Sequence, residues 1–371
     1  MKLCISLGMF HLKSLFYYVL FAIFRIYKNV IVYYDVNNKG ILYNNVLFFS
    51  FCYFLGYLLN IFPALINQRN SEANENLIAN GYGRENPQSI KYFKKFFIIS
   101  FILLIIDFLE NTLSLFISNS EEDFIFIEFI VIFLFAKYSK EVFYKHQNIS
   151  FVILILVEII KNIFLLRDKF SLKFGYIFKI FLSIIYSILY AIYYIYIYKL
   201  MKYKYISPYK INYMIGMINL PIIIIIYIII SFTPLGRYES DYYYGNIFDL
   251  FKNIRNLNTI NIILIITLPF VYGILLFLTN KIIYDFTIYH VYIPSLVENF
   301  LGIIFKNTEF TENIVLISSF FIELIMILIF LEIIELNFCG LNENLIRNIE
   351  LRSFVDSSLI KENEKDEFDK K

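Results

Sequence analysis

Pairs of charged side chains at helical spacing lie inside long apolar stretches of this sequence. Arg25 and Lys28 are three residues apart, and so are Asp107 and Glu110, with Asn111 directly after the second pair. Residues at this spacing share one face of a helix. An ionised group at the centre of a bilayer costs at least ~2.5–3.5 kcal/mol, so each pair requires a polar cavity or a partner of opposite charge.

Each pair has two interpretations. Arg25 and Lys28 form either a cationic patch that receives a phosphate or carboxylate, or one half of an ion pair with acidic groups on neighbouring helices. Asp107 and Glu110 either carry a proton or cation in exchange, or serve as structural counter-ions to Arg25 and Lys28. The residue types alone leave both alternatives open.

Other apolar stretches contain polar groups of the same kind. Glu158, Lys161 and Asn162 share one face, where Glu158 and Lys161 either neutralise each other or leave Lys161 for a substrate. Lys179 lies about one turn into its stretch and either snorkels to the interface or contacts substrate. The remaining candidates for the lining of a cavity are Asn60, Glu298 and Asn299.

Ten apolar stretches must position these side chains. They cover 14–34, 44–66, 93–117, 124–136, 149–166, 174–199, 211–232, 259–280, 285–305 and 313–336. Most approach the ~20 residues that a helix needs to cross a bilayer, although the fourth is short unless it continues through Tyr144. Lipid offers the backbone no hydrogen-bond partners, so the stretches must be helices.

The stretches fall into two groups of five. The sequence therefore predicts an all-α polytopic membrane protein with ten transmembrane helices in two inverted five-helix repeats, 14–166 and 174–336. Residues 1–13 form a cytosolic N-terminus, and 337–371 a cytosolic tail that is partly disordered.

Composition narrows the function. The chain is 59% hydrophobic and 17% charged, which is typical of multi-pass membrane proteins. It has no P-loop, no dinucleotide-binding glycine cluster and no metal-ligand spacing. We therefore expect neither an enzyme nor a bound cofactor or metal. Nucleic acid is not an expected partner, because the basic residues lie at the membrane edges.

Basic residues are distributed unequally between the two sides of the membrane. With the N-terminus in the cytosol, the far side carries eight Lys and Arg: Lys39, Arg167, Lys169, Lys173, Arg237, Lys252, Arg255 and Lys306. Four of the 33 lie inside the stretches, which leaves 21 on the cytosolic side. This excess follows the positive-inside rule and predicts cytosolic termini. The sequon Asn148-Ile149-Ser150 also falls on the cytosolic side, where it is not glycosylated.

The ends of the two halves are similar to each other. Residues 133–160 (FLFAKYSKEVFYKHQNISFVILILVEII) and 294–324 (PSLVENFLGIIFKNTEFTENIVLISSFFIEL) each contain a helix, an aromatic-Lys step, a polar turn and an apolar helix. These junctions resemble the drug/metabolite transporter superfamily, particularly solute carriers related to nucleotide-sugar transporters. The segment IDFLENTLSLF, with Asp107, Glu110 and Asn111, resembles the third helix of those carriers, and 198–220 is similar to their central cytosolic loop.

The resemblance implies a function. We expect a secondary transporter that moves a small polar or phosphorylated metabolite by alternating access, with Lys161 and other basic residues facing the cavity. Two alternatives stay open: a non-transporting membrane scaffold with the same fold, and a carrier of an organic cation or amine. The expected partners are a small-molecule substrate and the lipid bilayer, with a homodimer as a further option. The expected location is an endomembrane (Golgi or ER) or the plasma membrane.

Overall fold

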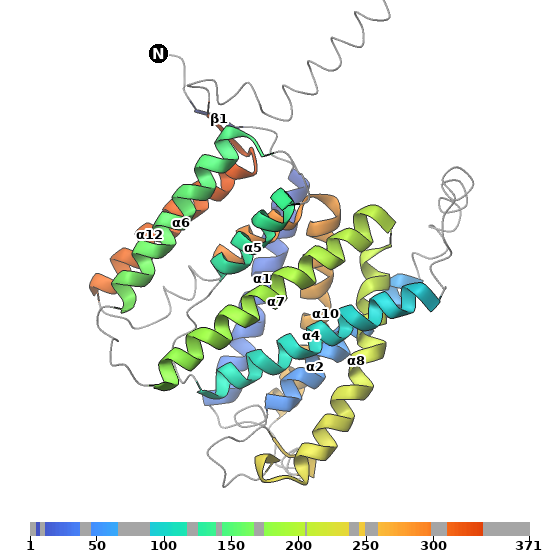
Figure 1. The fold of residues 1–371 in the computed structure, drawn as a ribbon. Coiled ribbons are helices and arrows are strands. Elements are labelled where there is room, and N and C mark those ends of the chain that lie inside the picture. Colours follow the sequence, from blue (N-terminus) through green and yellow to red (C-terminus); the bar gives the residue numbers. More distant parts are fainter. Residues whose placement is uncertain are drawn as a thin grey trace, which may run out of the picture. The chain divides into compact units, whose positions relative to one another are not determined.

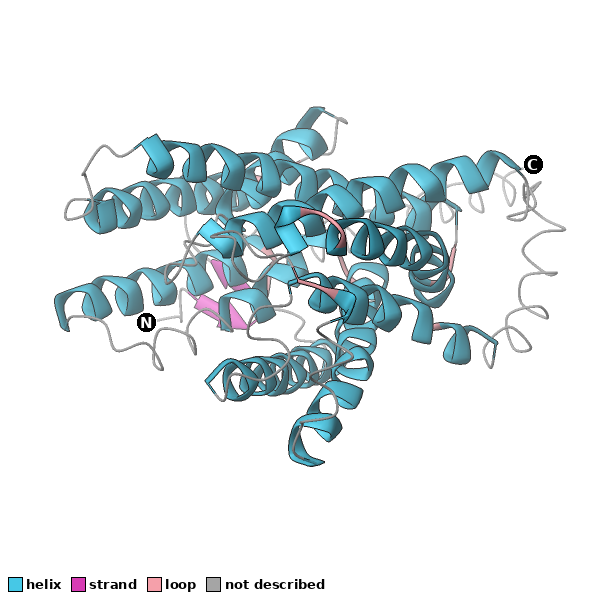
Figure 2. Cartoon of the chain, turned by 90° about the horizontal axis from the view of Figure 1, so that it is seen from below, coloured by secondary structure: helices cyan, strands magenta, loops and turns pink. Residues whose placement is uncertain are grey.

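The computed structural model describes residues 5–7, 12–37, 46–65, 90–116, 125–138, 143–166, 174–204, 206–236, 245–248, 259–297 and 310–336. Nearly all of them are helical (Figure 1). Within these ranges the only strands are two segments of 3 residues each (Figure 2).

The helices follow the apolar stretches. In chain order they are α1 (Leu12–Asn37), α2 (Val46–Leu59), α4 (Ile90–Phe116), α5 (Ile125–Tyr138), α6 (Lys145–Leu166), α7 (Phe174–Lys204), α8 (Pro208–Ser231), α10 (Thr259–Asp285) and α12 (Phe310–Phe330). The 3₁₀ turns are η2 (Pro234–Gly236) and η3 (Ile288–Val291), and the strands are β1 (Ile5–Leu7) and β2 (Ile334–Leu336).

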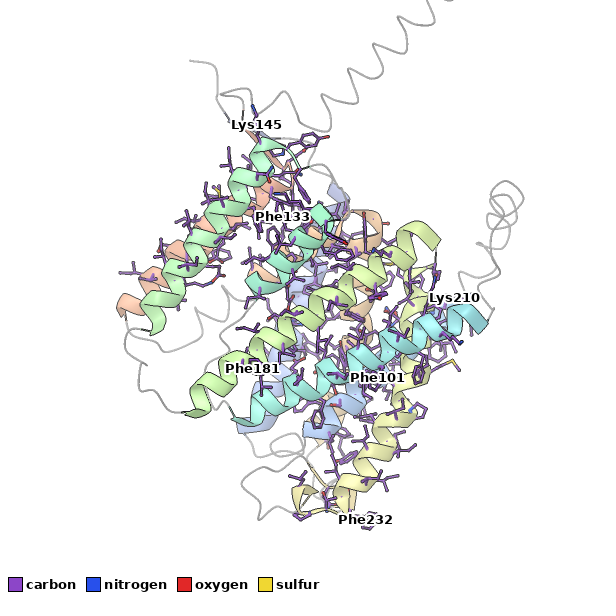
Figure 3. The ribbon with its side chains drawn as sticks, in the orientation of Figure 1. Phe101, Phe133, Lys145, Phe181, Lys210 and Phe232 are labelled. Carbon is purple, nitrogen blue, oxygen red and sulfur yellow. The ribbon has the colours of Figure 1, made fainter. Side chains whose placement is uncertain are left out.

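Four described segments are long and apolar enough to cross a membrane: Leu47–Leu65, Phe181–Met201, Pro208–Ser231 and Ile266–Asp285. They make the chain an integral membrane protein. Large apolar side chains on and beside the helices are exposed, such as Phe101 of α4, Phe181 of α7 and Phe232 directly after α8, at 53%, 58% and 70% (Figure 3). Such surfaces fit a lipid environment, since soluble proteins rarely expose apolar patches of this extent.

Several predicted boundaries are corrected. The described part of α5 has 14 residues, from Ile125 to Tyr138, which correspond to about 21 Å of helix. Helix α6 begins at Lys145 instead of 149. The polar residues 145–148, which were expected to form a turn, are the first turn of this helix. Helix α12 ends at Phe330 instead of 336, and β2 follows it. In the ninth stretch, Asp285 still belongs to α10 and η3 follows at Ile288–Val291, and residues 298–309 lie outside the described part.

Contacts divide the chain into two compact units. Unit 1 comprises residues 1–14, 134–170 and 299–371, and unit 2 comprises 15–133 and 171–298. In unit 1, α6 and α12 lie side by side (Figure 1). Strands β1 and β2 pair antiparallel, with Ile5 opposite Leu336. The segment before α1 and the segment after α12 are thereby joined.

The turn after α12 explains why that helix stops. The Ile333 N–H donates to the Leu328 carbonyl (2.9 Å), and the Glu332 N–H donates to the Ile329 carbonyl (3.1 Å). Glu332 has φ 60°, the left-handed conformation that usually selects glycine at this position. Its carboxylate lies 3.3 Å from Nε2 of the buried His146 on α6. The helix therefore ends in a turn that a pattern of apolar residues does not signal.

Glycines set the helix spacing in unit 2, where α2 packs on both α8 and α10. A Cβ added to Gly56 would lie 2.8 Å from the Gly273 nitrogen on α10. A Cβ added to Gly216 of α8 would collide with the backbone of Leu58. Small residues let helix backbones approach closely in membranes, where there is little hydrophobic drive for association.

Asparagines hold the same helices together. The Asn60 amide donates to the carbonyls of Gly56 (3.1 Å) and Gly273 (3.2 Å), so it joins α2 to α10. The Asn219 amide donates to the Ser100 carbonyl (2.9 Å) and joins α8 to α4. Elsewhere in unit 2, α1 packs on α10 through Phe21, and α4 packs on α7. The result is a helix bundle with buried polar links.

Candidate functional site

Tyrosines from α2, α7 and α10, and one from the segment directly after η3, lie inside unit 2. We define the tyrosine cluster as Tyr53, Tyr57, Tyr186, Tyr190, Tyr193, Tyr194, Tyr272 and Tyr292. The Tyr57 hydroxyl is 2.7 Å from that of Tyr193 and 3.3 Å from that of Tyr53. The Tyr53 ring meets the Tyr272 ring edge-on, with centroids 5.4 Å apart. Tyr186, Tyr190 and Tyr193 share one face of α7, because they are spaced by about one turn.

Charged groups converge on this cluster from three other helices. Glu110 of α4 accepts a hydrogen bond from the Tyr186 hydroxyl (3.4 Å). Arg25 of α1, Glu110 and Glu128 of α5 all interact electrostatically with Tyr186 and with Tyr190. These two tyrosines therefore lie within electrostatic range of charges of opposite sign from α1, α4 and α5.

The remaining two predicted charges lie on the Tyr272 side of the cluster. The Lys28 ammonium is 5.9 Å from the centre of the Tyr272 ring, a cation–π contact. Asp107 interacts electrostatically with Tyr272 and accepts a hydrogen bond from Ser50. The structure thus brings together four candidates that the sequence indicated: Arg25, Lys28, Asp107 and Glu110.

The cluster is deep along its helices. Arg25, Tyr190 and Tyr272 lie near the middle of helices of 26, 31 and 27 residues, which places each about 20 Å from a helix end. Asp107, Tyr190 and Tyr272 are only partly buried, so each keeps part of its surface accessible. Partly accessible polar side chains at this depth are expected along a solute path.

Unit 1 contains a different arrangement of charges. Nζ of Lys161 lies 2.6 Å from Oε1 of Glu158 on the same helix and 3.1 Å from Oε1 of Glu323 on α12. We call these residues the ion triad. Their side chains are 17%, 9% and 7% exposed for Lys161, Glu158 and Glu323 respectively. The ammonium thus joins α6 to α12, and Glu158 and Lys161 do pair with each other.

The structure says less about the remaining candidates that the sequence indicated. Asn60 lies in the packing of α2 against α10, as described above. Asn111 and Lys179 are on α4 and α7, but their side chains are outside the described part of the chain. Glu298 and Asn299 lie entirely outside the described residues.

Sequence reasoning missed Glu128 and the tyrosines. Glu128 is 7% exposed and is a lone carboxylate in a predicted apolar stretch, so the argument used for Asp107 also applied to it. It lies in the first turn of α5, where the helix dipole favours a negative charge. The tyrosine spacing on α7 was a usable signal, but the chain contains 32 tyrosines, which diluted it.

A groove of about 310 Å³ between α2 and α10 is a weaker candidate. Its walls are wholly apolar and include Phe48, Phe51, Cys52 and Phe270. Ile266 and Phe270 are 60% and 55% exposed, so this side of the helix pair faces outward. The groove offers no polar group to orient a polar solute, and the tyrosine cluster is the better site.

Comparison with known proteins adds no family. No protein-family model matches the sequence, and no curated protein matches it significantly. Among the described residues, no group of three or more His, Cys, Asp and Glu is arranged to hold a metal ion.

Proposed function

We propose that the chain is a secondary carrier whose substrate binds at the tyrosine cluster. The observation that carries the proposal is that Glu110 accepts a hydrogen bond from the Tyr186 hydroxyl (3.4 Å), while Arg25 and Glu128 act electrostatically on Tyr186 and Tyr190 within an apolar helix bundle. Ionisable groups inside a membrane are expensive, and they commonly mark substrate or ion pathways. Hydroxyls and ring faces around them supply hydrogen bonds and stacking for a small polar solute.

Further support comes from the partial accessibility of Asp107, Tyr190 and Tyr272. Polar side chains of a helix bundle that keep part of their surface accessible are expected around a solute cavity. In transporters such cavities lie near the bilayer midplane, between repeats. The cluster's position near the middle of its helices agrees with that location.

We further propose the fold of ten helices in two inverted five-helix repeats. Exchanging each helix with the one five places along relates α1 to α7, α2 to α8, α4 to α10 and α6 to α12. Under this exchange the α2–α8 and α6–α12 contacts map onto themselves, α2–α10 maps onto α8–α4, and α1–α10 maps onto α7–α4. The hydrogen bonds of Asn60 and Asn219 are exchanged in the same way. This regularity supports the repeat.

The proposed orientation has both ends of the membrane region on the cytosolic side. Support comes from the pairing of β1 with β2, which requires the segments before α1 and after α12 to be on the same side. The excess of basic residues in the loops on that side favours the cytosol. The proposed membrane is an endomembrane of the ER or Golgi, or the plasma membrane.

A membrane scaffold is the second candidate, and the ion triad favours it. That hypothesis requires the intramembrane charges to close on one another, as Lys161 does with Glu158 and Glu323. The carrier hypothesis requires only that the charges of unit 2 stay available to a solute. The two hypotheses therefore differ in what neutralising Arg25 or Glu110 does.

The test is solute exchange by the purified full chain in liposomes. The panel contains nucleotide sugars, other phosphorylated metabolites, amines and neutral polyols. We expect at least one class to exchange, and Arg25→Gln and Glu110→Gln to slow that exchange while the Tm changes little. Asp285→Asn is the matched control, because Asp285 pairs with Lys281 (3.0 Å) outside the cluster. Folded protein that exchanges no member of the panel would refute the carrier and leave the scaffold.

A further inference from the structure

The turn that ends α12 holds a strained residue against a buried histidine. Glu332 has φ 60°, a left-handed conformation that is unfavourable for residues with a side chain. Such strain persists only where surrounding contacts hold it, and it often marks a functional device. One of these contacts is made by His146 of α6, whose Nε2 lies 3.3 Å from Oε1 of Glu332. A glycine would suit the backbone at this position, but it could not meet the imidazole with a charge.

The contact between these two side chains depends on charge more than on hydrogen bonding. The side chain of His146 is 3% exposed, and that of Glu332 is 14% exposed. Nε2 is close to the carboxylate without being aligned for a hydrogen bond, and Nδ1 has no hydrogen-bond partner among the described residues. A neutral imidazole gains little from a misaligned contact, whereas an imidazolium is attracted to a carboxylate in any orientation. The pair therefore needs a proton on His146.

Among the described side chains around the pair, His146 is the one whose residue type changes charge between pH 5 and 8. Tyr144 stacks on its ring, with centroids 6.1 Å apart, and Lys145 beside it is exposed. The side chain of Glu335 on β2 lies outside the described part. The first turn of α6 disfavours a cation through the helix dipole, so Glu332 is what favours the charged histidine. Whatever else Glu332 contacts, an imidazolium is held by its carboxylate more strongly than a neutral imidazole is.

The pair controls the segment that carries β2. The Gln147 amide donates to the Phe330 carbonyl (3.4 Å), and this bond ties the last residue of α12 to α6 without a titrating group. Strand β2 begins two residues after Glu332 and pairs with β1, with Ile5 opposite Leu336. Two isolated strands of 3 residues each are only marginally stable by themselves. The ribbon therefore depends on the turn that places β2.

We infer that His146 and Glu332 form a pH-sensitive latch that keeps the β1–β2 ribbon closed. With a proton on His146, the ion pair holds Glu332 in its left-handed conformation, and β2 stays beside β1. When the proton leaves, the attraction is lost, the strain in the turn is released and the ribbon opens. Because the closed state binds the proton more tightly than the open state, closure is favoured at low pH and lost as the pH rises. The latch does not depend on the proposed carrier function.

The experiment measures whether the two strands are close together in the full chain in liposomes. Nitroxide labels are placed on Ile5→Cys and Leu336→Cys, in a chain that also carries Cys4→Ser and Cys339→Ser. Dipolar broadening of the spectrum then reports the closed ribbon, and Cys52 can stay because it is only 1% exposed. A single proton changes the closed-to-open ratio at most about tenfold per pH unit. We expect the ratio to fall about tenfold in total between about pH 5.5 and pH 8.

Variants separate the ion pair from the strain. His146→Gln and Glu332→Gln lack the charge pair but keep a left-handed residue with a side chain, so the ribbon should be open at both pH values. Glu332→Gly lacks the pair and the strain together, because glycine accepts this conformation, so the ribbon should be closed at both pH values. His11→Gln removes another histidine of unit 1 and is the matched control, which should keep the pH response.

Several results would overturn the latch. A closed-to-open ratio that does not change with pH in the chain with native His146 and Glu332 shows that no titrating group controls the ribbon. A pH response that survives in His146→Gln, or that disappears in His11→Gln, belongs to another group. A ribbon that opens with pH in Glu332→Gly contradicts the role of the strain. Should His146→Gln fail to fold, the two variants of Glu332 decide the question by the same measurement.

Discussion

Removing the ammonium of the ion triad should destabilise the protein far more than removing either carboxylate. Lys161 is shared by Glu158 at 2.6 Å and Glu323 at 3.1 Å, so Lys161→Met leaves two buried carboxylates facing each other. Glu323→Gln instead leaves a neutral Glu158–Lys161 pair with a hydrogen-bonding amide beside it. The size of the effect thus depends on which partner is removed, although each variant changes only one residue of the triad.

The magnitude follows from the burial of the triad. Breaking a buried ion pair by removing one partner costs about 3–5 kcal/mol, because an uncompensated charge stays behind. For 371 residues, an unfolding entropy of about 2.1 cal/mol/K per residue converts this cost into a Tm decrease of about 4–6 °C. We expect Glu323→Gln to shift the Tm by less than about 1.5 °C. The neutral triple variant Glu158→Gln/Lys161→Met/Glu323→Gln should recover most of the loss.

The reactivity of the Cys52 thiol can be used to measure the Tm of each variant. Its side chain is only 1% exposed on α2, so a fluorogenic thiol reagent reacts with it when the protein unfolds. Cys4→Ser and Cys339→Ser remove the other thiols. If Lys161→Met keeps its Tm but abolishes solute exchange, Lys161 faces the substrate and the structural interpretation of the triad is wrong. Failure of the triple variant to recover would also contradict the charge argument.

Two further predictions test the packing and the orientation. Gly56→Ala should lower stability by about 0.5–2 kcal/mol in the Cys52 assay, since overpacking at Gly273 costs ~1–3 kcal/mol and helix propensity returns ~0.5–1. Ile225→Ala, on a side chain that is 57% exposed, is its control, and an unchanged Tm for Gly56→Ala would contradict the close crossing. Lys145→Cys, at the exposed start of α6, should react with an impermeant maleimide only from the cytosolic side, and Asn148 should stay unglycosylated. Labelling from the opposite side alone would invert the proposed orientation.

The helices could be predicted from the sequence more easily than their ends. A backbone in lipid must satisfy its own hydrogen bonds, so each long apolar stretch was bound to be helical. The ends depend on local contacts instead. The Gln147 side chain accepts a hydrogen bond from the Tyr144 N–H (3.0 Å) and caps the start of α6, where the polar residues had indicated a turn. After α12, which packs on α6, Glu332 adopts the left-handed conformation that favours glycine, and the helix ends there. The neighbouring residues are mostly apolar, so the sequence did not indicate this end.

The sequence showed which charged residues of the candidate site are unfavourable in lipid, but not which residues they contact. The free-energy penalty for a charge in lipid singled out Arg25, Asp107 and Lys161 from the sequence alone. It could not say that Lys161 meets Glu323, which is 162 residues away, because contacts between helices depend on their rotation and relative height. Tyrosine carries no such penalty, so the cluster around Tyr190 became visible only through its packing.

The asparagine side chains and the charged side chains within the helices of this chain differ in what they indicate about function. Asn60 and Asn219 each lie about one turn from a glycine at a helix crossing, and each uses its amide N–H on a carbonyl of the neighbouring helix. Such residues have found their partners within the bundle, so their presence in a membrane says nothing about a solute. Arg25 and Glu110 keep accessible surface of their own, and they interact with Tyr186 and Tyr190, which are also partly accessible. A polar residue in an apolar helix is therefore informative about function to the extent that its surroundings remain open, and by that criterion the tyrosine cluster is the place to seek the substrate.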